Sequence, residues 1–65
     1  MIIYVLNFAT HTFYTTHRAS EAIRKVNSLM EQYALTADDF EIIAFDDASW
    51  RETRFDFEDF CEKWG

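Results

Sequence analysis

The sequence predicts an α+β fold, a single small domain in which a three-stranded antiparallel sheet carries one long helix and a short C-terminal helix, in the order ββαβα. The strands are indicated by runs of β-branched and aromatic residues at Ile2 to Phe8, Thr12 to Thr16 and Phe40 to Phe45. The helices are indicated by apolar residues at helical spacing in two other segments. The chain has 65 residues, no proline and one glycine, at the last position, so we expect residues 1–65 to form one domain without a linker.

The first two strands are predicted to form a β-hairpin. Thr12 to Thr16 repeats the β-branched and aromatic chemistry of Ile2 to Phe8, and only Ala9-Thr10-His11 separates them. This connection lacks the Asn-Gly or glycine that usually specifies a hairpin turn, so the sequence leaves its turn type open.

Both helices are predicted from apolar periodicity. In the long helix, residues spaced 4, 3, 4 and 3 apart line one stripe, namely Ala19, Ile23, Val26, Met30 and Tyr33. In the short helix, the positions i, i+3, i+4 and i+7 are Phe57, Phe60, Cys61 and Trp64. Asp56 is the predicted N-cap of the short helix, and Phe55 is placed to pack on Phe60 as a hydrophobic staple.

The segment from Asp46 to Arg54 carries two conflicting patterns. Ser49-Trp50-Arg51-Glu52 matches a helix capping box, whereas Thr53 to Phe57 alternates like a strand. We expect a helical turn or a loop there.

The predicted topology leaves one face of the sheet without an assured cover. A right-handed crossover places the third strand beside the first, which gives the sheet order 2-1-3 with antiparallel neighbours. The first strand is then central and apolar on both faces, with Ile2, Tyr4, Leu6 and Phe8 on one and Ile3 and Val5 on the other. The long helix can cover only one face. We therefore expect the C-terminal helix or a second subunit to cover the other, and we predict a homodimer or higher oligomer.

Aromatic residues are numerous for so short a chain, with seven phenylalanines, three tyrosines and two tryptophans. We expect most of them in the core, in particular Phe8, Phe13, Phe40, Phe45, Phe57 and Phe60. Trp50 is the exception, because it lies between an acidic pair and two arginines, a composition typical of interface hot spots. Its two interpretations are an exposed binding residue and a lid packed over the sheet.

No set of residues in the sequence suggests catalysis or a cofactor. His11 and His17 flank the second strand, roughly 20 Å apart at the rise of a strand, and are expected to be exposed. Cys61 lies on an apolar stripe, where a small hydrophobic residue fits better than a nucleophile. Asp46-Asp47 lacks the further ligands of a divalent-cation loop and is expected to be a solvated turn. Phosphate-binding glycine loops, serine elbows and zinc-ligand spacings do not occur, so we predict no enzyme, no metal and no cofactor.

The sequence favours a reducing, cytoplasmic location. Cys61 is the single cysteine, which allows no intrachain disulfide. The apolar segment from Ile2 to Leu6 lacks the basic flank of a signal peptide. No apolar run approaches the roughly 20 residues of a membrane span.

Charge is distributed unevenly along the chain. After Ala37 ten acidic residues stand against three basic ones, whereas the first 37 residues carry three basic and two acidic residues. The formal net charge is −6. The small cluster of Arg18, Arg24 and Lys25 cannot neutralise many phosphates, which disfavours direct nucleic-acid binding. The acidic half is either a solvated face or a surface that binds a basic partner.

A resemblance adds to this picture. Tyr14-Thr15-Thr16 leading into Glu21 to Val26, followed by Phe40 to Ile43, resembles the hairpin, helix and strand pattern of many short hypothetical proteins of phages and mobile elements. The acidic C-terminal half is similar in character to small anti-CRISPR and anti-restriction inhibitors. The resemblance covers most of the chain and implies a host-directed inhibitor, but it assigns no binding residue.

We therefore predict a non-enzymatic acidic protein–protein interaction module that inhibits a nucleic-acid-handling host complex by charge mimicry of a nucleic acid. The partner is expected to present a basic surface, and neither nucleic acid nor a membrane is expected to bind directly. The predicted partner-binding residues are Asp38, Asp39, Asp46, Asp47, Trp50, Glu52, Glu58, Asp59 and Glu62. The alternative is a self-associating accessory or regulatory protein whose acidity only provides solubility.

Overall fold

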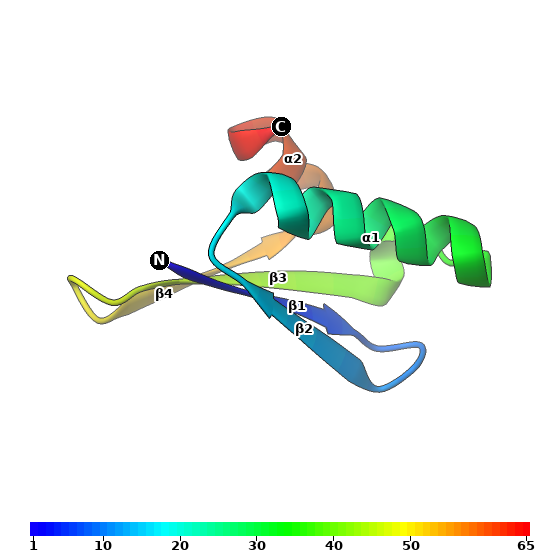
Figure 1. Ribbon diagram of the computed structural model, residues 1–65, viewed down its shortest axis with the longest axis horizontal. Coiled ribbons are helices and arrows are strands. Elements are labelled where there is room, and N and C mark those ends of the chain that lie inside the picture. Colours follow the sequence, from blue (N-terminus) through cyan, green and yellow to red (C-terminus); the bar gives the residue numbers. More distant parts are fainter.

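The computed structural model describes every residue from Met1 to Gly65 and has the element order ββαββα, with a short 3-10 turn before the third strand. The strands are β1 (Ile2–Asn7), β2 (Thr12–Thr16), β3 (Phe40–Asp46) and β4 (Arg51–Asp56). The helices are α1 (Ala19–Tyr33), η1 (Ala37–Asp39) and α2 (Phe57–Trp64). Both α-helices lie on the same side of the sheet (Figure 1).

The sheet has four antiparallel strands in the order β2-β1-β3-β4. The predicted order of the first three strands is confirmed. The prediction of a loop or helical turn over 46–54 is confirmed for Asp47 to Trp50, which form a turn, but is wrong for Arg51 to Arg54, because β3 and β4 form a second hairpin in which Asp46 pairs with Arg51. The match of Ser49 to Glu52 with a capping box was misleading, since Arg51 and Glu52 belong to a strand.

The core lies between the sheet and the two helices. Its buried residues come from every main element except β2 and β4, and they are Ile3, Val5, Ala22, Val26, Phe40, Ile42, Phe57 and Phe60. The predicted long helix is confirmed, although its buried stripe is centred on Ala22 and Val26, and Tyr33 is exposed. Of the phenylalanines expected in the core, Phe40, Phe57 and Phe60 are buried, but Phe8 and Phe13 are exposed and Phe45 is half-buried.

The C-terminal helix forms as its apolar spacing predicts, with Asp56 at the N-cap. The ring of Phe55 contacts those of Phe60 and Trp64, with centroids 5.9 Å and 5.1 Å away, so the predicted staple is present. However, α2 packs on the same side of the sheet as α1, and the expectation that it covers the second face is wrong (Figure 1). Phe55 faces the helix layer, and its contact with Phe60 holds α2 on that side.

The two hairpins share one turn geometry. Each strand before the turn ends in a residue whose side-chain oxygen accepts a backbone N–H two residues later, Asn7 from Ala9 and Asp46 from Ala48, both at 3.0 Å. Four residues then form each loop, and the last of them, His11 or Trp50, has a positive φ of 56° or 57°. A four-residue loop closes in this way without glycine, at the cost of a left-handed backbone at its last residue.

The repetition extends to the register of the sheet. Adding 39 to each residue number carries the pair Asn7–Thr12 onto Asp46–Arg51 and the pair Ile3–Thr16 onto Ile42–Phe55. For the central pair Leu6–Glu41, adding 39 to Leu6 gives Phe45 and subtracting 39 from Glu41 gives Ile2, and these two residues also pair. The sheet therefore has a pseudo-two-fold axis perpendicular to it between β1 and β3, and the chain is a tandem pair of ββα units.

Neither α-helix has the length and apolar character that a bilayer span requires.

Candidate protein-binding surface

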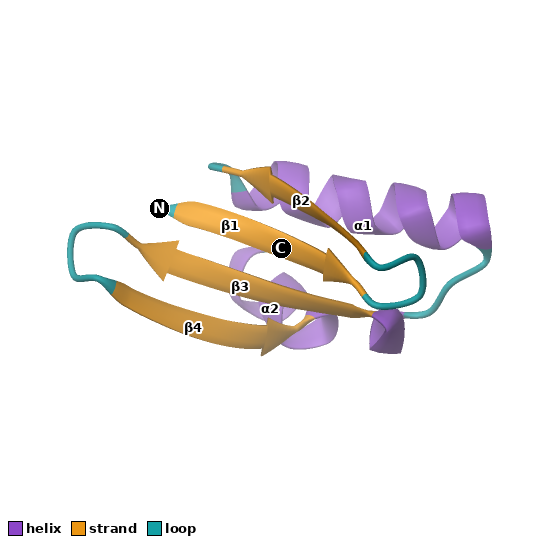
Figure 2. Ribbon diagram, turned by 90° about the horizontal axis from the view of Figure 1, so that it is seen from below, coloured by secondary structure: helices purple, strands orange, loops and turns teal.

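One face of the sheet carries no helix, and we call it the open sheet face (Figure 2). Because side chains alternate along each strand, the face is defined by every second residue of the paired strands. Its members are Ile2, Tyr4, Leu6, Phe13, Thr15, Glu41, Ile43, Phe45, Glu52, Arg54 and Asp56. The other set of alternate residues, which includes Ile3, Val5 and Ile42, faces the helices.

The centre of the open sheet face is apolar. The four central side chains Tyr4, Leu6, Ile43 and Phe45 are half-buried by their neighbours alone, and with Glu52 they line a shallow depression of about 340 Å³. Phe13 beside them is 70% exposed. This is a contiguous aromatic and aliphatic surface on three neighbouring strands, and surfaces of that kind on a protein mark interaction sites.

Charge on the open sheet face is confined to one side. All three open-face positions of β4 are charged, namely Glu52, Arg54 and Asp56, and Glu41 on β3 stands beside them. Arg54 Nη1 lies 3.5 Å from Glu41 Oε1, so these two charges partly compensate. The open-face residues of β2, Phe13 and Thr15, are uncharged. The face therefore has an acidic edge and a neutral edge.

Trp50 extends this surface at the β3–β4 hairpin. Its side chain is 82% exposed, and its ring meets that of Phe45 edge to face with centroids 6.0 Å apart. The interpretation of Trp50 as an exposed residue is therefore confirmed, and its role in binding stays a prediction.

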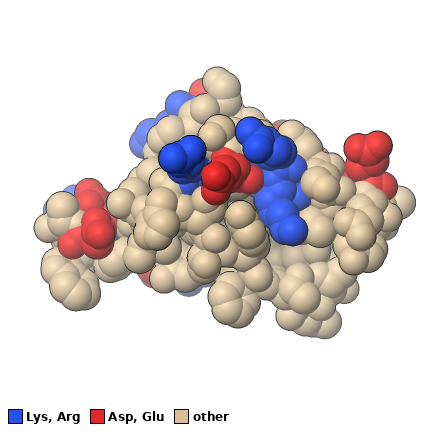
Figure 3. Space-filling model, viewed as in Figure 1, with Lys and Arg blue, Asp and Glu red and all other residues tan.

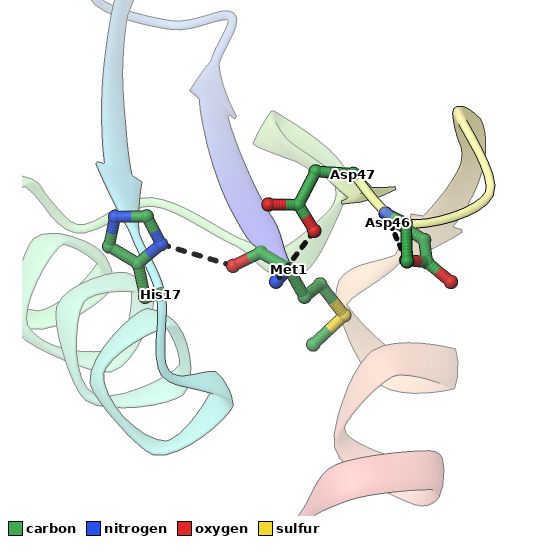
Figure 4. A network of polar contacts seen from close by, with 5 residues as sticks. Met1, His17, Asp46 and Asp47 are labelled. Atoms are coloured by element: carbon green, nitrogen blue, oxygen red, sulfur yellow. Dashed lines mark hydrogen bonds and ion pairs between the residues drawn. The ribbon is translucent and has the colours of Figure 1, made fainter.

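The hairpin tip is anchored to the N-terminus. The Met1 ammonium lies 3.6 Å from Asp47 Oδ1, and the Met1 carbonyl oxygen lies 3.1 Å from His17 Nδ1 (Figure 4). Hydrogen bonds from the Ala48 N–H and the Ser49 hydroxyl hold the pKa of Asp46 below its ordinary value of 3.8. Asp46 thus has hydrogen-bond partners within the turn, and Asp47 has the N-terminus as its ion-pair partner.

The other predicted binding residues divide between separate parts of the molecule. Asp46, Asp47, Trp50 and Glu52 belong to the β3–β4 hairpin, whereas Asp38, Asp39, Glu58 and Asp59 lie at the opposite end of β3, and Glu62 is further along α2. The length of β3 separates the two groups by about 20 Å. In Figure 3 basic side chains gather over α1 in the middle of the view, and the acidic hairpin projects at the left. The acidic half therefore does not form one continuous array.

One acidic group borders a cleft. Asp38, Asp56, Glu58 and Asp59 line a hollow of about 170 Å³ beside the phenylalanines that start β3 and α2. Asp39 does not line it, because its side chain accepts a hydrogen bond from the Thr36 N–H in a capping box around η1.

The residues considered for catalysis remain apart. His11 and His17 are both exposed, as expected. Cys61 is half-buried against the core, and burial raises the pKa of its thiol above the ordinary value of 9.0, which disfavours the reactive thiolate.

Sequence reasoning missed the central residues of the open sheet face as binding candidates. The signal was present, because the alternation in β1 shows apolar residues on both of its faces and α1 can cover only one. The missing information was the side on which α2 packs.

In comparisons with protein-family models, curated proteins and solved structures, no match was found, so the surface is interpreted from its own chemistry.

Proposed function

We propose that this protein is a non-enzymatic protein–protein interaction module that binds through its open sheet face. The observation that carries the proposal is the uncovered apolar centre of that face, Tyr4, Leu6, Ile43 and Phe45, extended by Phe13 and Trp50. Leaving such a surface in water costs roughly 25 cal/mol for each Å² of apolar area, and a bound protein surface removes that cost.

The character of the face supports a protein as its ligand. Aromatic side chains on a sheet can also stack on nucleic-acid bases, but nucleic-acid binding depends on basic groups around them. Here the face carries three carboxylates, from Glu41, Glu52 and Asp56, against Arg54 alone. The depression is also too shallow and open to enclose a small molecule. A protein interface with an apolar centre and a polar rim fits this surface best.

The experiment is a comparison of two variants that add the same charge. Ile43→Glu places a carboxylate at the centre of the open sheet face, and Asn27→Glu places one on the exposed side of α1. Tagged and untagged copies are co-expressed in the organism that encodes the chain, and all proteins retained with the tag, untagged copies included, are quantified. We expect the amount of a specific partner protein retained by Ile43→Glu to be at least tenfold lower than the amount retained by Asn27→Glu. Equal recovery with both variants would refute the proposal.

Trp50 supplies a second probe of the same surface. If it is a hot spot of the interface, Trp50→Ala weakens partner binding by at least about 2 kcal/mol, with little dependence on salt. Trp50→Gly is the control for the backbone, because glycine adopts the left-handed conformation of this position without strain. Both variants should lose binding equally, whereas an effect of the turn conformation would appear in the alanine variant only.

We propose, as a second candidate, that the acidic residues bind a basic protein and thereby imitate a nucleic acid. The observation that favours it is the cleft bordered by Asp38, Asp56, Glu58 and Asp59. The triple variant Asp38→Asn, Glu58→Gln and Asp59→Asn removes charge there and leaves intact the turn hydrogen bonds that Asp39 and Asp46 accept. Binding that depends on charge should fall in this variant and with rising salt. Unchanged affinity at every salt concentration would assign the acidity to solubility.

A further inference from the structure

We infer that the occupant of the open sheet face is a second copy of this chain, packed face to face with its two-fold axis parallel to the strands. This inference rests on the proposed function, because it names the partner of the same surface. It specifies which strands meet, so it can fail while the proposed function stands.

The size of the face suits a weak dimer. The Cα atoms extend over 36 × 23 × 16 Å, and the sheet occupies the plane of the longest and shortest dimensions (Figures 1 and 2). That plane corresponds to a footprint of roughly 600 Å² per copy, or about 1,200 Å² for the pair, which is the lower end of standard-size interfaces. We therefore expect a dissociation constant in the micromolar range.

A face-to-face pair allows two orientations of the two-fold axis within the interface. With the axis perpendicular to the strands, β4 faces β4 of the second copy. Glu52 then lies over Asp56 of that copy, and Arg54 lies over its equivalent, because Arg54 is the middle one of the three open-face positions. Like charges meet at three places, and such juxtaposition costs several kcal/mol in an interface.

With the axis parallel to the strands, the charged edges of the two copies are kept apart. The acidic edge β4 then faces the neutral edge β2 of the second copy, so that Arg54 lies over Thr15 and Asp56 lies over Phe13. The charged groups of β4 stay at the rim, where water reaches them, whereas Glu41 on β3 lies over Leu6 of the second copy. β1 of each copy then lies over β3 of the other copy, which places Tyr4 over Ile43 and Ile2 over Phe45. This arrangement buries the apolar centre of both copies, and the one approach of like charges is between the two Glu41 side chains, which flank the axis and each have Arg54 of their own copy as an ion-pair partner.

The first test is the oligomeric state. Sedimentation equilibrium of the unmodified chain between about 1 μM and 1 mM should show a monomer–dimer equilibrium. Ile43→Glu should shift the dissociation constant upward by at least tenfold, while Asn27→Glu should change it by less than threefold. Circular dichroism of each variant verifies that it is folded, and Tyr4→Lys replaces Ile43→Glu if the latter is not. A chain that stays monomeric over the whole range would overturn the inference.

The second test is the orientation, measured by cross-linking in a Cys61→Ala background. Facing sheets lie about 10 Å apart, so a bismaleimide of about that span joins cysteines on opposed strands. Copies with Thr15→Cys and copies with Arg54→Cys are mixed. The axis parallel to the strands predicts cross-links between the two variants only, because the two Thr15 positions then lie roughly 17 Å apart. Cross-linking of Arg54→Cys copies to each other would indicate the perpendicular axis, and cross-linking of Thr15→Cys copies alone would indicate pairing through the β2 edge. Either result would overturn the inference.

The outcome also separates this inference from the proposed function. A monomeric chain that captures a different protein, lost in Ile43→Glu and retained in Asn27→Glu, removes the dimer and leaves the interaction module. A monomeric chain that captures nothing specific removes both.

Discussion

Three residues other than glycine have a left-handed backbone, His11, Ala34 and Trp50, with φ between 55° and 57°. Each closes an element: His11 and Trp50 end the hairpin loops, and Ala34 is the C-cap of α1. Glycine is the usual residue at such positions, and this chain has its single glycine at position 65. The fold therefore holds conformational strain at three identifiable places.

Ala34→Gly should stabilise the protein. The left-handed conformation costs an L-residue about 1–2 kcal/mol, and glycine removes that cost but loses about 0.5–1 kcal/mol through its freer unfolded state. The net gain should be roughly 0.5–1 kcal/mol, measured as the free energy of unfolding in urea. Ala48→Gly is the control. Ala48 lies in a turn but does not have a positive φ, so the same change there should destabilise the protein. A loss of stability in Ala34→Gly would show that the C-cap is not strained.

Asp46 should make the stability of the second hairpin dependent on pH. Its pKa in the folded state is lower than in the unfolded chain, because the Ala48 N–H and the Ser49 hydroxyl favour the charged carboxylate. The unfolded state therefore binds the proton more readily, and the stabilisation is present above the ordinary pKa of 3.8 and is lost as the pH falls through the folded-state value.

Asp46→Asn tests this sign. The amide keeps an oxygen that can accept from the Ala48 N–H but does not titrate, so the melting temperature of the variant should fall less steeply than that of the parent below about pH 4. Asp47→Asn, which changes the neighbouring carboxylate, is the comparison. Parallel melting curves for parent and Asp46→Asn would contradict the assignment.

At the scale of elements, prediction succeeded where local sequence decides structure. The periodicity of α2 and the staple between Phe55 and Phe60 are local, and both are present. By contrast, β4 is an edge strand in which Phe55 is the single residue that is not exposed, so the alternation from Thr53 to Phe57 was too short to predict the strand. Its pairing with β3 determines its conformation. The likeness of Asn7-Phe8-Ala9-Thr10-His11 to Asp46-Asp47-Ala48-Ser49-Trp50 was the available signal for a second hairpin.

The helix α2 should be essential for folding. Phe57 and Phe60 are 6% and 0% exposed, and burying each side chain stabilises the fold by roughly 1.5–3 kcal/mol. That contribution is a large part of the stability of a small domain, so a chain ending after Asp56 should not fold. Phe60→Ala should cost about 3–5 kcal/mol in urea unfolding, and Glu62→Gln on the exposed side of the same helix should cost less than about 0.5 kcal/mol. A cooperative, native-like transition of the truncated chain would show that α2 is an appendage.

At the scale of the whole molecule, the sequence predicted the need for a cover on the second face but not the identity of that cover. The apolar residues of β1 on both faces, such as Val5 and Leu6, were visible in the sequence. The choice between α2 and a second subunit depended on where β4 directs the chain, and that is a matter of long-range pairing. The acidic residues were also visible, and the structure separates them because the length of β3 lies between Asp38 and Asp47.

Salt should therefore distinguish the two kinds of binding considered for this molecule. Two copies that each carry a net charge of −6 repel one another, whereas their apolar faces attract independently of charge. Raising ionic strength from about 0.1 M to about 1 M shortens the Debye length from about 10 Å to about 3 Å and screens that repulsion. The dissociation constant of the dimer, measured by sedimentation equilibrium, should fall or stay constant over this range, and Asn27→Glu should show the larger fall because it adds a negative charge. Binding of a basic partner to the acidic cleft should instead weaken. Self-association that weakens as salt rises would mean that ion pairs hold the copies together, and the apolar face would then need another partner.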